Sequence, residues 1–194
     1  MKVLLASKSP RRKELLKKVI PTFAHYSPEV DEDYVGTSPR DTVEVIAKRK
    51  LDKALEEKHG FDMVISADTM VAVKGQLLGK PKDKEDARRM LTLLSKNPHE
   101  VYTAVAVYYN GEHYLLCEVS KVTLSFKDDA EIEQYISDKK HFDKAGAYAI
   151  QDEEKNWSYK GSYDNIMGLP TERLAELLKT IIRPEVDSID PVKS

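Results

Sequence analysis

The amino-acid sequence predicts a mixed α/β fold, and three observations support this prediction. The chain begins with a short apolar run, residues 3–6, followed by a polar turn and then by apolar residues at helical spacing. Its clearest signal is a long antiparallel hairpin over residues 101–109 and 113–126. The dipeptide Asn110-Gly111 between these stretches is a favoured hairpin turn. We therefore expect a two-lobed mixed sheet with a long antiparallel hairpin and flanking helices, rather than a purely parallel doubly wound sheet.

The elements of the first half follow in order. The apolar strand over residues 3–6 runs into Pro10, which suits the first position of a helix. A second short strand is expected over residues 22–26, before the acidic, turn-rich segment 27–37. Ser38 then caps a long helix. The apolar positions of that helix form one stripe: Val43, Ile46, Ala47, Leu51, Ala54 and Leu55.

The second half contains further strands and helices. The apolar run 63–67 predicts a buried strand that ends at Asp68, with a short hairpin over residues 71–75 beginning there. Asp83 and Asp86 open a helix in a capping-box-like pattern. Two more helices are expected over residues 130–136 and 171–182, separated in part by a Gly- and Pro-containing loop over residues 161–170.

The composition bounds the organisation and the partners. The chain of 194 residues carries 31 Lys and Arg against 33 Asp and Glu, a formal net charge of -2. It therefore has no global basic field for nucleic acid or an anionic membrane, and any phosphate recognition must be local. We expect a single two-lobed domain over residues 1–183 and a polar C-terminal tail over residues 184–194.

Other features favour a cytoplasmic location. The single cysteine, Cys117, cannot form an internal disulfide, which suits a reducing compartment, and we expect it to be a small buried hydrophobe. The N-terminus lacks a signal-peptide hydrophobic region, and no apolar run approaches membrane-spanning length. The five histidines are scattered without zinc-site spacing or an evident nucleophile partner, which argues against a zinc site and a catalytic triad.

The polar turn over residues 6–12 has the composition of an anion site. Ser7 and Ser9 provide hydroxyls, while Arg11 and Arg12 stand where the unpaired amides of a helix N-terminus gather. Because arginine at a helix start opposes the helix dipole, two of them favour an external negative charge, and their planar forks suit phosphate. The alternative is an ordinary Ser9 cap with two solvated arginines. The turn by itself does not separate these interpretations.

Three other charged positions admit both a chemical and a structural interpretation. Asp68 is expected at a strand end, where α/β proteins hold catalytic groups but where turn-forming aspartates are also common. The acidic segment with Asp31 and Glu32 offers a second carboxylate for Mg²⁺ shared with substrate phosphates, or is merely solvated. Lys80 lies in a Gly-Lys-Pro loop and is either a point charge for phosphate or an ordinary surface lysine.

Several motifs, in matching order and spacing over almost the whole chain, resemble the Maf family. They lie at residues 5–16, 67–69, 79–81, 143–148 and 161–170. The resemblance implies a cytoplasmic nucleoside triphosphate pyrophosphatase, in a group also called septum-formation inhibitor proteins, with a fold similar to that of inosine triphosphate pyrophosphatases. It implies cleavage between the α and β phosphates, with Mg²⁺ or Mn²⁺ as cofactor. The Ala-Asp-Thr triplet resembles the branch that hydrolyses dTTP and UTP.

The resemblance also assigns roles to single residues. It implies a phosphate-binding set: Ser7, Arg11, Arg12, Lys50 and Lys80. Asp68 matches the proposed proton acceptor and Glu32 matches an acidic-loop position, and both are candidates for holding the metal. Positions linked to substrate choice are matched by Arg11, Thr69 and Gln151. Cations of this set would neutralise the leaving pyrophosphate, and Asp68 would either deprotonate the attacking water or bind Mg²⁺ directly.

The pyrimidine preference that the resemblance implies is physically reasonable for the amide of Gln151. An amide can donate to O4 of uracil or thymine and accept from N3–H, a pattern that the amino group of cytosine disrupts. This chain departs from many relatives, which have small residues or glycine after the matched glutamine, because it carries Asp152-Glu153-Glu154-Lys155 there. That run places added negative charge near a site for a polyanion.

Two other functions remain open at this stage. One is a nucleotide-sensing regulator of cell division without significant turnover, and the other is a pyrophosphatase of different base specificity. Nucleic-acid and membrane partners are not expected, because the chain lacks net positive charge, an aromatic-basic stripe and a spanning segment. The sequence does not determine the oligomeric state, although homodimers are common in the family that it resembles.

Overall fold

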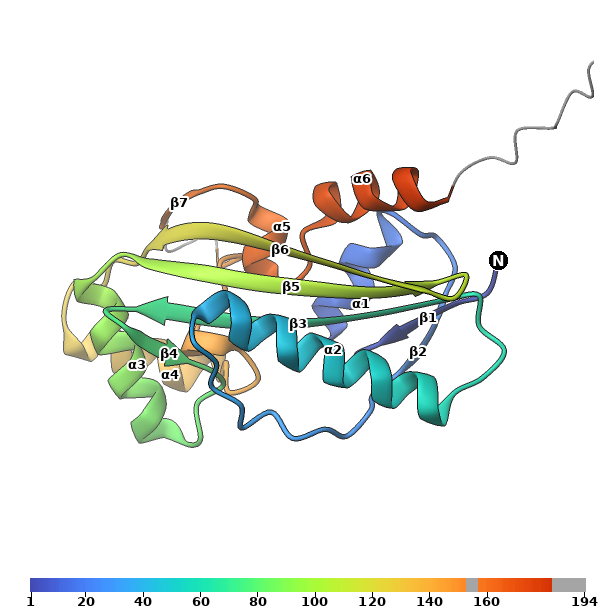
Figure 1. Cartoon of the computed structure of the whole chain (residues 1–194). Helices are drawn as coiled ribbons and strands as arrows, with labels where there is room; N and C mark the ends of the chain where they lie inside the picture. Colours follow the sequence, from blue (N-terminus) through green and yellow to red (C-terminus); the bar gives the residue numbers. More distant parts are fainter. Residues whose placement is uncertain (153–156, 183–194) are drawn as a thin grey trace, which may run out of the picture.

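A single mixed sheet organises the computed structural model, which describes residues 1–152 and 157–182 (Figure 1). Its seven strands have the order β2-β1-β3-β5-β6-β7, with β4 beside β3. The strands are β1 (Val3–Ala6), β2 (Ala24–Tyr26), β3 (Met63–Val73), β4 (Gln76–Leu78), β5 (His99–Tyr109), β6 (Glu112–Thr123) and β7 (Ser158–Lys160). The helices are α1 (Pro10–Lys17), α2 (Pro39–Glu57), α3 (Lys84–Lys96), α4 (Asp129–Lys139), α5 (Tyr163–Met167) and α6 (Thr171–Ile181), with a 3-10 turn, η1 (Ala145–Ala147).

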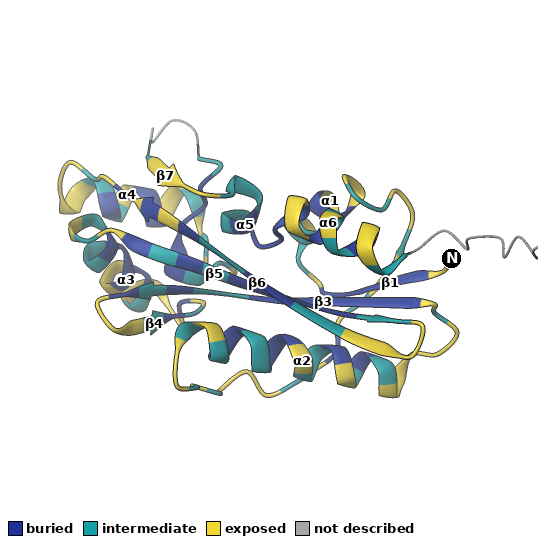
Figure 2. Ribbon diagram, turned by 45° about the horizontal axis from the view of Figure 1, so that its top comes forward, coloured by how far each residue is buried: buried dark blue, intermediate teal, exposed yellow. Residues whose placement is uncertain are grey.

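Helices cover both faces of this sheet. The apolar stripe of α2 packs on one face, and α1 and α6 pack on the opposite face (Figure 2). A third buried cluster lies where α3 and α4 meet the far halves of β3, β5 and β6. Because side chains alternate along a strand, Val64, Ser66 and Asp68 face α2, whereas Ile65, Ala67 and Thr69 face α1.

The expected end of a strand at Asp68 is wrong. β3 runs without interruption through Asp68, because β5 pairs with it from Met63 to Ala72. On the other edge of β3, β1 pairs only with residues 63–65 and β4 only with residues 71–73. Residues 66–70 therefore lack a strand partner on that edge among the described residues. This gap between β1 and β4, rather than a strand terminus, opens the edge of the sheet beside Asp68.

Most locally encoded elements agree with the sequence. The side chains of Ser9, Ser38 and Asp83 accept hydrogen bonds at helix N-termini, and the hairpin turns at the predicted Asn110-Gly111. β6 ends at Thr123, three residues before its predicted end. The predicted short hairpin is confirmed, because β4 pairs antiparallel with β3 across a turn at Lys74-Gly75. The segments β7, α5 and η1 were not predicted, because each has only three to five residues and is defined by its packing partners rather than by periodicity.

Cys117 is a buried thiol, as predicted. It is 6% exposed and packs in the cluster beneath α2. Burial raises the pKa of its thiol to about 11, so the group is neutral and unreactive at physiological pH. In the part of the chain that the structure describes, no helix combines the length and apolarity needed to cross a membrane.

We expect His99 to make stability pH-dependent. It is 2% exposed, its Nε2 lies 2.7 Å from Tyr148 Oη, and burial lowers its pKa to about 4. An unfolded chain protonates histidine near pH 6.5, so between these pKa values only the unfolded state gains the proton. The stability that depends on neutral His99 is thus fully present above about pH 6.5. The free energy of unfolding falls by about 2 kcal/mol on acidification from there to about pH 5.

Denaturant unfolding at several pH values measures this effect. His99→Gln keeps a neutral partner for Tyr148 and should flatten the slope between about pH 7 and about pH 5. His59→Gln, at an exposed position, is the matched control and should leave the slope as it is in the parent chain. An unchanged slope in His99→Gln would show that His99 does not cause it.

Candidate active site

Charged and polar side chains from several segments converge at the gap between β1 and β4. The turn after β1 brings Ser7, and the start of α1 brings Arg12. From α2 comes Lys50, and from the edge of β3 comes Asp68. Loop residues complete the set, namely Glu32 before α2 and Lys80 after β4. A surface hollow of about 450 Å³ beside α3 is lined by other residues. Convergent charge marks the candidate site.

The turn before α1 is both a helix cap and a holder of arginines. Ser9 Oγ accepts from the backbone N–H of Arg12 at 3.4 Å, and the N–H of Ser9 donates to Ser7 Oγ at 3.2 Å. Ser7 is 8% exposed. The Ser9 cap is confirmed, but the alternative of two solvated arginines is wrong, because both guanidinium groups bind protein oxygens. Anion binding by the turn stays a prediction.

Arg12 is fixed by two short hydrogen bonds. Its Nε donates to the carbonyl of Gly168 at 2.8 Å, and its Nη2 donates to Thr69 Oγ1 at 2.9 Å. Gly168 has φ 117°, a conformation that favours glycine, so the residue type helps to place this carbonyl. Burial lowers the pKa of Arg12, although the charge of Asp68 opposes this shift, and the guanidinium stays protonated. Three of its five N–H groups have no partner among the described residues, and they can bind an anion.

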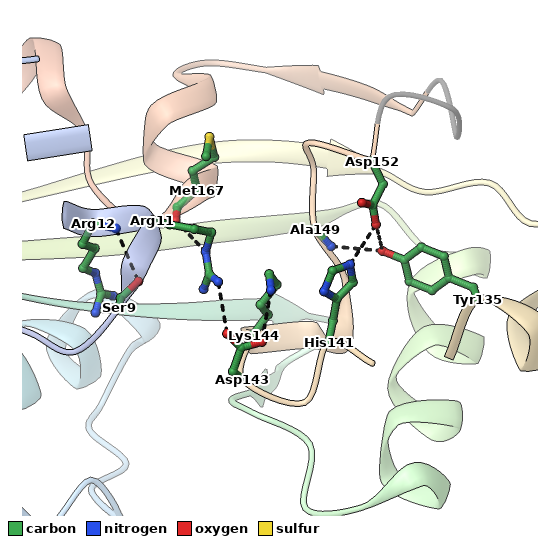
Figure 3. Close-up of polar contacts among 10 residues, drawn as sticks. All are labelled: Ser9, Arg11, Arg12, Tyr135, His141, Asp143, Lys144, Ala149, Asp152 and Met167. Carbon is green, nitrogen blue, oxygen red and sulfur yellow. Dashed lines mark hydrogen bonds and ion pairs between the residues drawn. The ribbon is translucent and has the colours of Figure 1, made fainter. Parts of the chain in front are cut away.

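Arg11 points to a different part of the site. Its Nε donates to the carbonyl of Met167 at 3.4 Å, and its Nη1 lies 3.3 Å from Asp143 Oδ2 (Figure 3). Lys144 also contacts Asp143, and its Nζ lies 3.0 Å from Oδ1. Arg12 therefore faces the edge of β3, whereas Arg11 faces the segment that leads to Gln151.

Asp68 is held by a lysine that also binds a second carboxylate. Lys50 Nζ lies 2.9 Å from Asp68 Oδ1 and 3.0 Å from Glu32 Oε1. Asp68 is 6% exposed, and its Oδ2 is shielded from solvent without a hydrogen-bond partner in the described part of the chain. A buried oxygen without a partner is costly, so this atom marks a position where a ligand, a water or a metal ion would be stabilised.

Electrostatic coupling extends across the gap. Partial burial opposes ionisation of Glu32, but the charge and hydrogen bond of Lys50 hold the pKa of this carboxyl below its ordinary value. Partial burial lowers the pKa of the Lys80 ammonium, and the nearby charges of Lys50 and Lys8 act in the same direction, against Glu32. Lys8, in the turn after β1, thus belongs to the same electrostatic group. Mutual repulsion of these cations favours an anion between them.

A divalent cation fits this donor set only in part. Within residues 1–152 and 157–182 no group of three or more His, Cys, Asp or Glu side chains is arranged to hold a metal. Glu32 and Asp68 flank Lys50, and the unpaired Asp68 Oδ2 is a hard oxygen donor. Two carboxylates fit an ion such as Mg²⁺, which keeps several waters and takes its remaining ligands from substrate phosphates.

The residues predicted to govern substrate choice lie in two separate places. Thr69 is not a free hydroxyl facing a ligand, because its Oγ1 accepts from Arg12 and lies 2.9 Å from Thr103 Oγ1. Gln151 is half-buried in the segment after η1. Thr103 was missed by the sequence interpretation, although a hydroxyl within an apolar strand could have indicated it.

Asp152 does not direct its charge at the phosphate-binding arginines. It is bound by Tyr135 Oη and by His141 Nε2, the latter at 2.9 Å (Figure 3). Lys139 Nζ lies 3.9 Å from Asp152 Oδ1. Its side chain is 11% exposed. Internal donors hydrogen-bond the Asp152 carboxylate but leave its negative charge in place, so the expected effect of the acidic run on a polyanion site stays a prediction. The following acidic residues and the C-terminal tail lie outside the described residues.

An α/β sheet whose edge gathers one buried carboxylate and several cations defines a protein that handles a phosphate polyanion. The chain belongs to the Maf family, because the profile of the Maf-like protein matches residues 2–181. It is 42% identical over 184 residues to the dTTP/UTP pyrophosphatase of Carboxydothermus hydrogenoformans, which covers 92% of this chain and 98% of that relative. It is 41% identical over 182 residues to the protein of the same name from Acholeplasma laidlawii, with 91% and 95% covered.

A solved structure shares the fold. The HAM1 protein from Coxiella burnetii superposes with a TM-score of 0.50 at 11% identity, over 93% of this chain and 99% of that chain. At this identity the likeness concerns the fold alone. The predicted family and fold class are confirmed.

Proposed function

We propose that this protein hydrolyses dTTP and UTP to the nucleoside monophosphate and pyrophosphate, with a divalent cation. The observation that carries the proposal is the buried Asp68 carboxylate, which Lys50 fixes through one oxygen while the other has no partner among the described residues. The relatives named dTTP/UTP pyrophosphatase match nearly the full length of this chain, which supports the substrate class. We place the activity in one catalytic domain over residues 1–183, acting in the cytoplasm.

The chain supplies both parts of the required chemistry. Water attacks the α-phosphorus, and its proton passes to Asp68 Oδ2. The bond from the α-phosphorus to the oxygen that bridges the α and β phosphates breaks as pyrophosphate leaves. Developing negative charge on the leaving group is stabilised by a preorganised set of donors: Ser7, Arg11, Arg12, Lys50 and Lys80. Arg12 suits this role because two contacts already hold its guanidinium, so little side-chain freedom is lost when phosphate binds.

A divalent cation would be held by Glu32 together with substrate phosphates, and by Asp68 in the alternative in which Asp68 binds the ion instead of accepting the proton. When bound, such an ion supplies Lewis-acid polarisation of phosphoryl oxygens. Lys50 lies between the same carboxylates, and its charge holds the pKa of Glu32 below its ordinary value. Glu32 is therefore ionised near neutral pH and can receive a cation.

Turnover of a nucleotide panel tests the function. The enzyme is mixed with Mg²⁺ and dTTP, UTP, CTP or purine triphosphates, and pyrophosphate and orthophosphate are measured separately. We expect pyrophosphate from dTTP and UTP, at rates that exceed those for CTP and purines, and no activity after chelation of the cation. Tight nucleotide binding without product at high enzyme concentration would instead indicate a sensor, and equal rates for all bases would contradict the specificity.

Base selection should depend on Gln151. Its amide can pair with O4 and N3–H of uracil or thymine. The following residue, Asp152, is held by hydrogen bonds with Tyr135 and His141, which fixes this segment. We expect Gln151→Ala to lower the UTP/CTP ratio of kcat/KM by about tenfold, the value of one lost hydrogen-bonded discrimination. Gln134→Ala, an exposed glutamine on α4, is the control. An unchanged ratio in Gln151→Ala would remove Gln151 from base recognition.

A further inference from the structure

A chain of hydrogen bonds begins at the partly buried side chain of Arg12 and leads away from the site into the interior. Arg12 Nη2 donates to Thr69 Oγ1 at 2.9 Å. Thr69 Oγ1 lies 2.9 Å from Thr103 Oγ1 on the neighbouring strand β5. The hydroxyl of Thr103 donates to the backbone carbonyl of Asn165 in α5 at 3.0 Å. The orientation of Arg12 is thus linked to a residue that has no contact with solvent, since Thr103 is 0% exposed.

The direction of each hydrogen bond in this chain is determined. A carbonyl only accepts, so the single proton of the Thr103 hydroxyl is directed to Asn165. The proton between the two threonines must therefore come from Thr69, which also accepts from Arg12. The Thr69 hydroxyl consequently has no proton left to donate to a substrate base. Its effect on substrate binding must pass largely through Arg12.

The far end of the chain is anchored on three elements. Asn165 is 0% exposed, and its Nδ2 donates to the carbonyl of Val101 on β5 at 3.1 Å and to Ser120 Oγ on β6 at 3.0 Å. Both amide protons of Asn165 are therefore used. Ser120 Oγ in turn donates to the carbonyl of Ser162, the N-cap of α5, at 2.9 Å. A buried network of this kind fixes α5 on the sheet.

The same helix supplies a second contact to Arg12. Gly168, the C-cap of α5, accepts from Arg12 Nε at 2.8 Å, while the Asn165 carbonyl holds the threonine pair that accepts from Nη2. The Nε and Nη2 contacts of the Arg12 guanidinium therefore both depend on α5, the first directly through Gly168 and the second through Thr103 of β5. A small shift of α5 would change both contacts together.

We propose that Thr103 and Asn165 are positioning residues for Arg12, which act through the hydroxyl of Thr69 and orient the guanidinium toward the substrate phosphates. The proposal rests on the proposed function. It also gives Thr69 an indirect role in substrate choice, as the residue that holds Arg12, rather than as a donor to the base. Thr103 and Asn165 themselves do not contact the ligand.

Substitution of Thr103 tests the proposal. Thr103→Val keeps the shape but removes the hydroxyl, and Thr103→Ser keeps the hydroxyl. We expect Thr103→Val to lower kcat/KM for UTP by about tenfold through a higher KM, the effect of about one lost hydrogen bond, and Thr103→Ser to stay within about twofold of the parent. In an Arg12→Lys background, where the fork is absent, Thr103→Val should have little further effect.

Coupling to Arg12 separates positioning from a merely structural role. Thermal unfolding confirms the folded fraction of each variant, and isothermal titration with inorganic pyrophosphate measures binding without turnover. Equal losses from Thr103→Val in the parent and Arg12→Lys backgrounds, or parent-like kinetics in folded Thr103→Val, would overturn the proposal. If Thr103→Val does not fold, Thr69→Val against Thr69→Ser provides the same test of coupling. Absence of turnover in the parent chain would contradict the proposed function. Comparison of pyrophosphate binding by the parent and by Thr103→Val would still test the positioning role.

Discussion

Asp68→Asn is expected to reduce pyrophosphate release by about 10²- to 10⁴-fold, the usual contribution of a general base. The amide keeps the shape of the side chain and one oxygen for Lys50, but it removes the negative charge and the proton acceptor at Oδ2. Nucleotide binding should persist, because Arg12, which is proposed to bind phosphate, keeps its contacts with Thr69 and Gly168. Initial rates with dTTP and titration with the same nucleotide measure the two effects.

A matched control separates this effect from a general loss of charge. Asp52→Asn changes an exposed carboxylate on α2 and should leave rates as in the parent. A rate within tenfold of the parent for folded Asp68→Asn would remove Asp68 as the proton acceptor. Loss of both binding and turnover would instead assign to Asp68 the role of holding the metal and substrate.

Lys50→Met is the second change with a large expected effect, a loss of about 10²-fold or more in kcat/KM, as for removal of one preorganised donor. Lys50 is 12% exposed and bridges Asp68 and Glu32. Without its ammonium the two carboxylates repel each other, and the pKa of Glu32, now held below its ordinary value by Lys50 against the opposing effect of burial, should rise.

The activity of Lys50→Met should also depend on pH in a different way from that of the parent. In the parent chain the depressed pKa keeps Glu32 ionised until the pH falls below the ordinary carboxyl range. In the variant, Glu32 becomes protonated at a higher pH, so the acid limb of the rate profile should move to higher pH. Lys48→Met, at an exposed position of the same helix, is the control and should leave the profile in place. An acid limb that stays fixed in Lys50→Met would show that this coupling does not control activity.

The sequence by itself determined the features that depend on neighbouring residues. Caps at Ser9 and Ser38, the apolar stripe of α2 and the turn at Asn110-Gly111 arise from local hydrogen bonding and from periodic burial, which short stretches encode. Motif order also identified the family and the residues Asp68, Lys50 and the arginines of the turn. Their roles remain proposals, because shared position does not by itself show contact with a substrate.

Only the tertiary structure decided how these residues are presented. Asp68 lies beside an open edge of the sheet because β1 and β4 leave a gap along β3, and pairing across sequence-distant strands cannot be deduced from the apolar run before it. The partners of Arg12 lie far along the chain, Thr69 by 57 residues and Gly168 by 156. Hydrogen bonds over such separations leave no periodic pattern in a sequence. Packing of α5 against the sheet therefore fixed the orientation of Arg12, which its position in the turn had left open.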